Sequence, residues 1–194
     1  QRLKICAVRY CRHTKYLQEL TLWTSLIKHA LGKLLGDLKM SEYEKKILLS
    51  EKEYIYLLKR SNIINQIEQT NFYFDTDDLL MNSRGITCRI RKKGNQYKAV
   101  VKWHVGEYGS CSVEENLYEK DTFDAIGFEK MGLKLQGELL TVRTVIHKDE
   151  FCEIVLDKNS YLGYTDFELE IEYAQGHEEK ALQHLKSFAM YFAD

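Results

Sequence analysis

From residue 41 onward, the chain consists of short stretches in which charged or polar residues alternate with apolar ones. Successive side chains of an extended strand point to opposite faces, so this alternation predicts strands with one apolar and one charged face. So many alternating stretches constrain the chain to fold around a sheet. The predicted strands cover residues 41–50, 66–76, 85–93, 96–104, 110–118, 137–147, 150–157 and 166–174.

The connections between these stretches indicate an antiparallel sheet. Gly94-Asn95 and Lys148-Asp149 each separate two predicted strands by a tight turn, which is the signal of a hairpin. Helices are predicted only at the margins, over 51–60, 121–131 and 178–192, and the first has Ser50 and Glu53 at capping-box spacing. A parallel α/β fold would need a helix between most strands. The pattern therefore predicts an α+β domain, an eight-stranded antiparallel β-barrel with flanking helices.

Residues 1–39 differ from the rest of the chain. They hold eight Lys/Arg and two Asp/Glu, and apolar residues at three- and four-residue spacing predict an amphipathic helix over 15–38. Met40 reads as a natural start of a polypeptide. We therefore expect residues 1–39 to form a basic helical extension and 40–194 the functional domain. A basic amphipathic helix can dock on a partner, on a membrane surface or on its own domain.

Composition excludes several classes of function. Residues 40–194 hold twenty Lys/Arg and twenty-seven Asp/Glu, a net charge of −7, which argues against a nucleic-acid binder. No apolar run approaches the ~20 residues of a membrane span. Five cysteines without a Cys-x-x-Cys pair predict a reduced, cytoplasmic protein. The histidines at 104, 147, 177 and 184 show no metal-ligand spacing.

The charges on the polar faces are sorted by strand. Acids concentrate on the first, fifth and last predicted strands, and bases on the third and fourth. Rows of like charge repel, and removing them from water costs several kcal/mol each unless they are paired or bind an ion. Two interpretations stay open here. Either these are solvated faces of exposed strands, or they line a closed cavity in which acids hold divalent cations and bases hold a polyanion such as a phosphate chain.

Seven motifs in order between residues 41 and 190 resemble those of the CYTH superfamily, the triphosphate tunnel metalloenzymes. This superfamily includes bacterial CYTH proteins, class IV adenylate cyclases and relatives of thiamine triphosphatase. Any single motif is weak, but their order and spacing together are specific. The motifs are Glu42-x-Glu44-x-Lys46, Asn71-Phe-Tyr-Phe-Asp-Thr76, Cys88-Arg89-Ile-Arg91, Val101-Lys102, Glu114, Leu156-Asp157 and Gly163 followed by Phe167-Glu168-Leu-Glu170.

The resemblance implies an eight-stranded tunnel that processes a small triphosphate with Mg²⁺ or Mn²⁺, in a protein that is often a homodimer. Lys46 would position or activate the attacking water, so that Lys46, Glu44 and Glu170 form the implied catalytic set. The implied metal ligands are Glu42, Glu44, Glu114, Asp157, Glu168 and Glu170. The implied phosphate-binding residues are Arg89, Arg91, Lys98, Lys102 and Arg143.

Three functions are compatible with this resemblance. Metal-dependent hydrolysis of inorganic tripolyphosphate or a small organic triphosphate is preferred, because no base-recognition motif is present. A class IV adenylate cyclase and a non-catalytic module that binds polyphosphate or nucleotides are the alternatives. Two residues are assigned to places outside this site: Glu172 to the rim or surface, and Cys88 to packing outside the tunnel.

Overall fold

The structure is a computed structural model that describes residues 42–105 and 111–189, without the side chains of Glu42, Val105, Cys111 and Ala189. The predicted extension over 1–39 and the end of the last predicted helix therefore lie outside the described residues. No helix in the described part of the chain combines the length and apolarity needed to cross a lipid bilayer.

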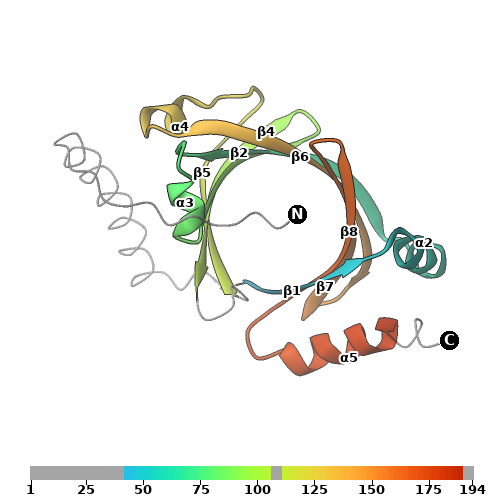
Figure 1. Cartoon of the computed structure of the whole chain (residues 1–194). Coiled ribbons are helices and arrows are strands. Elements are labelled where there is room, and N and C mark those ends of the chain that lie inside the picture. The colour runs from blue at the N-terminus through green and yellow to red at the C-terminus, as the bar shows by residue number, and fades with distance from the viewer. Residues whose placement is uncertain (1–41, 106–110, 190–194) are drawn as a thin grey trace. The chain divides into compact units, whose positions relative to one another are not determined.

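Eight antiparallel strands curl into a barrel that surrounds a tunnel, as the alternation predicts (Figure 1). Around the barrel the order is β1-β5-β4-β3-β2-β6-β7-β8. The seam between β1 and β5 holds two residue pairs, whereas β1 pairs with β8 over seven. The strands are β1 (Glu42–Leu49), β2 (Asn65–Asp75), β3 (Ile86–Lys93), β4 (Gln96–Val105), β5 (Cys111–Lys120), β6 (Lys134–Lys148), β7 (Cys152–Tyr161) and β8 (Tyr164–Tyr173).

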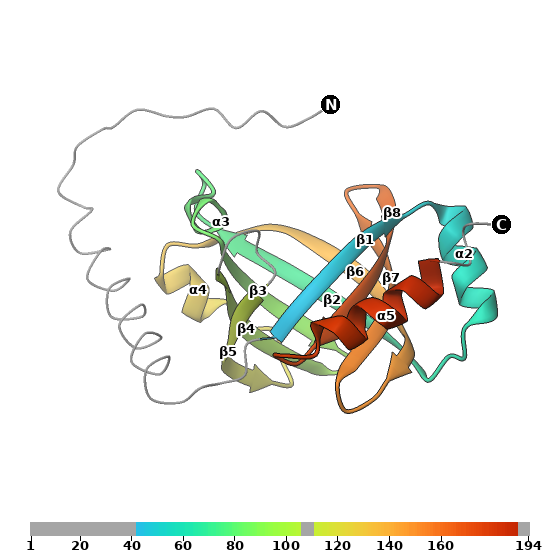
Figure 2. The ribbon, with the colours of Figure 1, turned by 90° about the horizontal axis from the view of Figure 1, so that it is seen from below.

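The helices lie around the outside of the barrel (Figures 1 and 2). They are α2 (Glu51–Arg60), α3 (Leu80–Ser83), α4 (Ile126–Lys130) and α5 (Glu178–Ala189). The predicted capping box begins α2: Ser50 Oγ accepts a hydrogen bond from the Glu53 N–H, and the Ser50 N–H donates to the Glu53 carboxylate at 2.6 Å. This reciprocal pair satisfies N–H groups that have no partner within the helix.

The main hydrophobic cluster lies outside the tunnel wall. Tyr54 and Leu57 of α2 and Ala181 and Leu185 of α5 pack with outward-facing residues of β6, β7 and β8. Leu57 is 1% exposed, and full burial of such a side chain contributes about 1.5–3 kcal/mol. Because this cluster supplies apolar burial on the outer face, the inner face of the same strands can carry charge. The strand members of the cluster are Ile146, Cys152, Ile154, Leu156, Phe167, Leu169, Ile171 and Tyr173.

Several predicted boundaries were wrong, most clearly at one helix and one hairpin. The helix expected over 121–131 is shorter and comprises only α4. Asp124 Oδ1 accepts a hydrogen bond from the Ile126 N–H at 2.9 Å, which favours a turn rather than helix before Ile126. Strands β7 and β8 extend further toward each other than predicted, to a two-residue turn at Leu162-Gly163. Both residues have positive φ, 48° and 79°. This matches a type I′ hairpin, but Leu rarely adopts positive φ, so the sequence gives no turn signal at Leu162.

Candidate functional site

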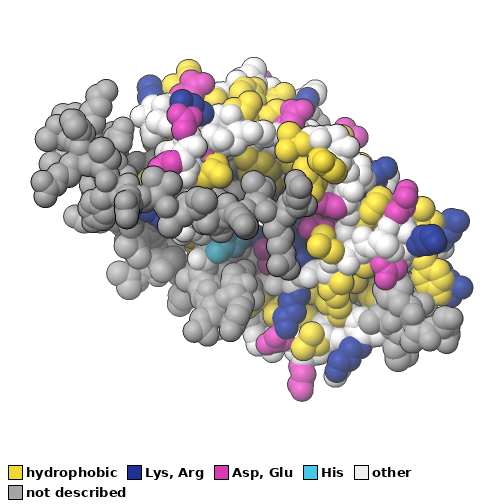
Figure 3. Space-filling model, viewed as in Figure 1, with side chains coloured by type: hydrophobic (Ala, Val, Ile, Leu, Met, Phe, Trp, Pro, Cys, Tyr) yellow, Lys and Arg dark blue, Asp and Glu magenta, His cyan; other side chains and the backbone are white. Residues whose placement is uncertain are grey.

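A polar cavity of about 500 Å³ runs through the barrel and receives side chains from all eight strands. Within each strand the lining residues are mostly two apart, because alternate side chains face the tunnel. Figure 3, viewed along the tunnel as in Figure 1, shows acidic, basic and hydrophobic side chains mixed on the surface of the barrel end that faces the viewer. Inside the tunnel, by contrast, acids and bases gather on different strands.

The acidic side of the tunnel is built by β1, β7 and β8. Lys46 lies opposite Glu170 and Glu44 opposite Glu172 across the antiparallel β1–β8 pair, and directly opposed residues share a face. On β7, Asp157 lies opposite Glu168. The result is two groups of three carboxylates whose ligand oxygens lie within 4.8 Å of one another: Glu44, Glu170 and Glu172, and Asp157, Glu168 and Glu170.

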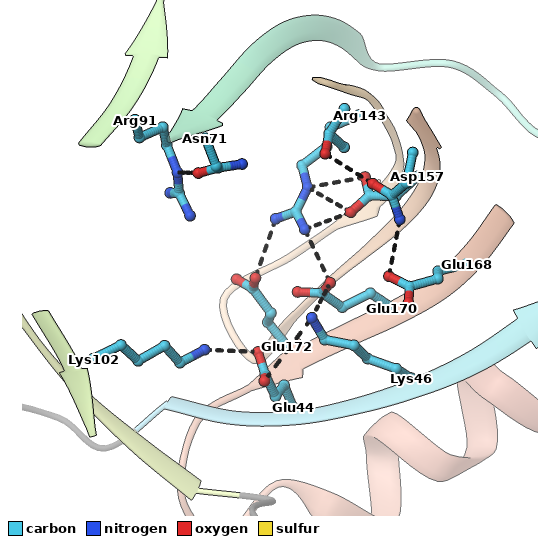
Figure 4. A network of polar contacts seen from close by, with 12 residues as sticks. Glu44, Lys46, Asn71, Arg91, Lys102, Arg143, Asp157, Glu168, Glu170 and Glu172 are labelled. Carbon is cyan, nitrogen blue, oxygen red and sulfur yellow. Dashed lines mark hydrogen bonds and ion pairs between the residues drawn. The ribbon is translucent and has the colours of Figure 1, made fainter. Parts of the chain in front are cut away.

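Arg143 on β6 bridges both carboxylate groups (Figure 4). Its Nη2 lies 2.7 Å from Asp157 Oδ2 and 3.0 Å from Glu170 Oε2. Its Nη1 donates to Glu172 Oε1 at 3.2 Å. Burial alone would disfavour the guanidinium, but the hydrogen bond to Asp157 and the charge of Glu170 outweigh it, so the pKa of Arg143 is raised. One cation therefore compensates three acids.

Two lysines pair with Glu44 and Glu170 in this wall. Lys102 Nζ on β4 lies 3.1 Å from Glu44 Oε2, and Lys46 Nζ lies 3.0 Å from Glu170 Oε2 and 4.0 Å from Glu44 Oε1. Burial works against the charged form of Lys46, but Glu170 and Glu44 outweigh it and raise its pKa. Lys46 is therefore an ammonium ion at neutral pH. It suits the binding of an anion better than the removal of a proton.

The two buried acids of this wall respond oppositely to their surroundings. Burial by itself raises the pKa of Glu170, but the charges of Arg143 and Lys46 reverse this and lower it to about 2. At Asp157, burial outweighs the hydrogen bond from Arg143, and its pKa is raised. The wall thus favours the negative charge of Glu170 and disfavours that of Asp157.

The basic side of the tunnel is built by β3 and has fewer counter-charges. Arg91 donates from Nε to the neutral Asn71 at 3.0 Å (Figure 4). Burial, followed by the charge of Arg89, lowers the pKa of Arg91 to about 10. Arg89 pairs with Glu114 at 2.9 Å, yet its Nε is buried without a hydrogen-bond partner in the described part of the chain. Burial and the charge of Arg91 also lower the pKa of Lys93. These cations repel one another, and a bound anion would relieve that repulsion.

Most residues that the resemblance implicates line this cavity: Glu44, Lys46, Arg89, Arg91, Lys102, Glu114, Arg143, Asp157, Glu168 and Glu170. The side chain of Glu42 lies outside the described residues. Lys98 is opposite Arg91 in register but is not among the residues that line the cavity. The register shift at Ala99 and Val100 lies in the pairing with β5, where Leu117 is the extra residue, whereas β4 pairs with β3 without a break from Lys98 to Lys102. Lys98 therefore lies on the same face as Arg91, and, after burial, its charge is one of the causes that lower the pKa of Lys93.

The lining residues that were not predicted for the site include Glu172, Lys93, Asn71 and Asn159. Glu172 had been assigned to the rim or surface, but its carboxylate lies beside those of Glu44 and Glu170. Glu172 is two residues after Glu170, so strand alternation alone could have placed it on the tunnel face. Lys93 likewise continues the alternation of Arg89 and Arg91. Asn71 and Asn159 contact Arg91 and Glu168. They are neutral, so only strand parity could have indicated them. Cys88 is buried and is not a lining residue, as predicted.

Known proteins share both the sequence pattern and the fold. A protein of Bacillus subtilis (strain 168), provisionally named the triphosphatase YjbK, is 27% identical over 163 residues, which are 73% of this chain and 85% of that protein. The crystal structure of a provisionally named adenylate cyclase of Bacillus halodurans is 25% identical, with a TM-score of 0.60 over 76% of this chain and 89% of the other.

A third similarity concerns the fold alone. HpAC1 of Hippeastrum, a provisional adenylyl cyclase described as having a dominant triphosphatase activity, is 20% identical. Its TM-score is 0.57, over 77% of this chain and 88% of the other. The family model of the CYTH domain matches residues 40–189, which include all eight strands of the barrel. The chain belongs to the CYTH domain family.

Proposed function

We propose that this protein hydrolyses a small triphosphate, inorganic tripolyphosphate or an organic triphosphate, inside its tunnel with the help of Mg²⁺ or Mn²⁺. The observation that carries the proposal is the division of one buried cavity into a carboxylate wall and a basic wall. A phosphate chain with its divalent cations is a ligand that matches both walls at once. The relative from Bacillus subtilis is also provisionally named a triphosphatase.

The basic wall supports the binding of the phosphate chain. Arg91 and Lys93 carry charges that burial and neighbouring cations disfavour, and phosphate oxygens would compensate them. The unpartnered Nε of Arg89 supplies a further buried donor. Arginine suits this task because its planar group can bind two phosphate oxygens together.

The carboxylate wall fits the divalent cations. Both groups of three side chains offer only carboxylate oxygens, which are the ligands that Mg²⁺ and Mn²⁺ prefer. Glu44, Glu170 and Glu172 would hold one cation, and Asp157 and Glu168 would hold another together with Glu170. A divalent cation supplies Lewis acidity: it neutralises phosphate oxygens and lowers the pKa of bound water.

The chain's own residues then orient the reaction. The oxygen of a water attacks the terminal phosphorus in line with the bridging oxygen, and the bond between phosphorus and that bridging oxygen breaks. Lys46 stays protonated, so it binds a terminal phosphate oxygen and holds the water without taking its proton. Glu44 lies 4.0 Å from Lys46 Nζ and orients the water together with it, and the proton of the water leaves on the released orthophosphate. Arg89 and Arg91 stabilise negative charge on the phosphate chain.

Adenylate cyclase activity is the second candidate, because the Bacillus halodurans protein, 25% identical, carries that provisional name. Cyclisation requires the 3′ hydroxyl of ATP to attack the α-phosphorus, with release of pyrophosphate. Hydrolysis of tripolyphosphate needs no nucleoside at all.

Product analysis separates these functions. The full chain is incubated with tripolyphosphate, ATP or thiamine triphosphate and with Mg²⁺ or Mn²⁺, and orthophosphate, pyrophosphate and cyclic AMP are measured. We expect orthophosphate from tripolyphosphate. Cyclic AMP and pyrophosphate from ATP, with tripolyphosphate left intact, would replace the hydrolase by a cyclase. Binding of the triphosphate without formation of any product would indicate a non-catalytic binding module.

A further inference from the structure

A second group of metal-ligating side chains lies outside the tunnel, where β6 turns into β7 beside α5. It consists of His147, Asp149, Cys152 and His184. One nitrogen, oxygen or sulfur atom from each lies within 4.8 Å of those from the other three. Three of the residues come from a single hairpin, and the fourth comes from the helix near the end of the described chain. Nothing in the proposed triphosphatase chemistry uses them.

A β-bulge brings His147 to this outer group. By simple alternation, His147 would share the tunnel face with Arg143 and Val145. The register shifts between Val145 and His147, so that His147 lies opposite Ile154, a member of the outer hydrophobic cluster. Bulges redirect side chains in this way. The predicted absence of a metal spacing among the histidines was therefore incomplete, because the bulge and α5 bring together residues that are distant in sequence.

The two imidazoles converge on one carboxylate oxygen. His147 Nε2 lies 3.1 Å from Asp149 Oδ2, and His184 Nε2 lies 3.8 Å from the same oxygen. The two rings are tilted by 35° to each other, with their centroids 4.3 Å apart. Both histidines and Asp149 are about one-third exposed, at 30%, 36% and 33%, whereas Cys152 is only 5% exposed. A cation could thus enter from solvent and meet the thiol at the bottom of the group.

Backbone hydrogen bonds orient the carboxylate toward the histidines. Asp149 Oδ1 accepts from the N–H groups of Phe151 and Cys152 at 2.7 and 2.8 Å. These two bonds fix one oxygen in the turn and aim the other, Oδ2, at the imidazoles. Hydrogen bonds that hold a ligand in place in this way are typical of metal sites.

We propose that His147, Asp149, Cys152 and His184 bind a divalent transition metal ion, with Zn²⁺ as the best match. Zn²⁺ favours four ligands drawn from Cys sulfur, His nitrogen and carboxylate oxygen. The tunnel groups offer only carboxylate oxygens and so favour Mg²⁺ or Mn²⁺ instead. Four protein ligands fill a tetrahedral shell, which is the pattern of a structural site rather than of a catalytic one. The ion would fasten α5 to the β6–β7 turn.

Binding has one opposing cost. Burial, with the nearby Asp149 as a further cause, raises the pKa of the Cys152 thiol to about 11, whereas a metal binds the thiolate. Binding at neutral pH must therefore displace this proton, and the ion's own charge favours that displacement. Without metal, the same residues would remain a hydrogen-bonded Asp149–His147 pair beside a neutral thiol.

Cobalt provides a probe that reports the ligands directly. Full-length protein is freed of metal with a chelator and titrated with Co²⁺ in excess Mg²⁺, which competes for the carboxylate sites of the tunnel. We expect intense visible bands of tetrahedral Co²⁺ and a near-ultraviolet thiolate-to-cobalt band, both saturating at one equivalent. Addition of Zn²⁺ should abolish both, and Zn²⁺ added to protein already in excess Mg²⁺ should raise the melting temperature further.

Substitutions assign the bands to these residues. Cys152→Ser should abolish the thiolate band, and His184→Ala should weaken Co²⁺ binding by about tenfold or more. His184 is partly exposed, so this variant tests the site even if the buried Cys152→Ser unfolds. Matched controls are His104→Ala, at an exposed histidine elsewhere, and a Cys6→Ser/Cys11→Ser double variant, which removes other thiols. Both controls should behave as the unaltered chain. The proposal would be overturned if the unaltered chain showed no thiolate-to-cobalt band. It would also be overturned if His184→Ala bound Co²⁺ with undiminished affinity.

Discussion

Arg143 and Asp157 face each other across β6 and β7 and form a two-pronged ion pair in the tunnel wall. Arg143 Nε lies 3.0 Å from Asp157 Oδ1, and Arg143 Nη2 lies 2.7 Å from Oδ2. The same guanidinium reaches Glu170 and Glu172. Arg143 therefore compensates the same carboxylates that bound divalent cations would compensate.

Removal of Arg143 should destabilise the fold in a way that metal repairs. Arg143→Ala leaves Asp157 and Glu170, which are 3% and 2% exposed, without their strongest partner. Loss of one partner of a buried ion pair costs about 3 kcal/mol. Urea unfolding should show a loss of this size without metal and a clearly smaller loss in Mn²⁺, because Mn²⁺ supplies the missing charge. An equal loss in both conditions would argue against cation binding at these acids.

Arg91→Ala should weaken substrate binding without weakening the fold. The protein disfavours the charge of Arg91, as its lowered pKa of about 10 indicates, so its removal relieves repulsion from Arg89. We expect a change in unfolding free energy below about 0.5 kcal/mol and a KM for tripolyphosphate raised about tenfold or more, since a hydrogen bond to a charged group contributes about 1.5–3 kcal/mol. The exposed Arg84→Ala is the matched control. An unfolded Arg91→Ala variant would make Arg91 a structural residue.

Glu170 should give the protein an acid-sensitive contribution to stability. Its pKa is lowered from an ordinary 4.5 to about 2, so its favourable interactions are fully present above about pH 4.5 and are lost as the pH falls toward 2. The raised pKa of Asp157 acts in the opposite direction. The difference in unfolding free energy between the unaltered chain and Glu170→Gln therefore isolates Glu170. It should shrink as the pH is lowered from 5 to 2, and a difference that stays constant would refute the assignment.

Metal and triphosphate should strengthen each other's binding. Arg143, Lys46 and Lys102 form ion pairs with carboxylates of the tunnel wall. When cations take over those carboxylates, the three basic groups become available to phosphate oxygens. We expect the affinity for Mn²⁺, measured by calorimetry, to rise severalfold when a non-hydrolysable triphosphate is present, and the triphosphate affinity to rise equally. Independent affinities would show that the basic groups do not change partners.

The alternation of the strands was sufficient to predict the barrel and the direction of most tunnel side chains. Glu44, Lys46, Glu168 and Glu170 are on the tunnel wall because parity along a strand fixes the face of each residue. The hairpin at Gly94-Asn95 was also predicted correctly. Glycine is suited to this turn because its first residue has a positive φ, 56° at Gly94.

Two features could not be predicted from the sequence: a break in the alternation, and contacts between residues that are distant in sequence. The bulge after Val145 turns His147 away from the tunnel, and nothing in the local sequence marks it. The three-way contact of Arg143 with Asp157, Glu170 and Glu172 depends on how three strands pair. Parity placed these residues on one face without indicating which acids share a cation.

The most direct test of the proposed function is phosphate release from tripolyphosphate by the unaltered chain, Glu170→Gln and the control Glu129→Gln, with and without Mn²⁺. Glu170 belongs to both carboxylate groups, whereas Glu129 is exposed on α4. We expect Mn²⁺-dependent turnover by the unaltered chain and by Glu129→Gln, and a loss of about a hundredfold or more in Glu170→Gln, because one removed electrostatic contact costs about this much. Undiminished turnover by a folded Glu170→Gln variant, or turnover that does not need metal, would contradict the account.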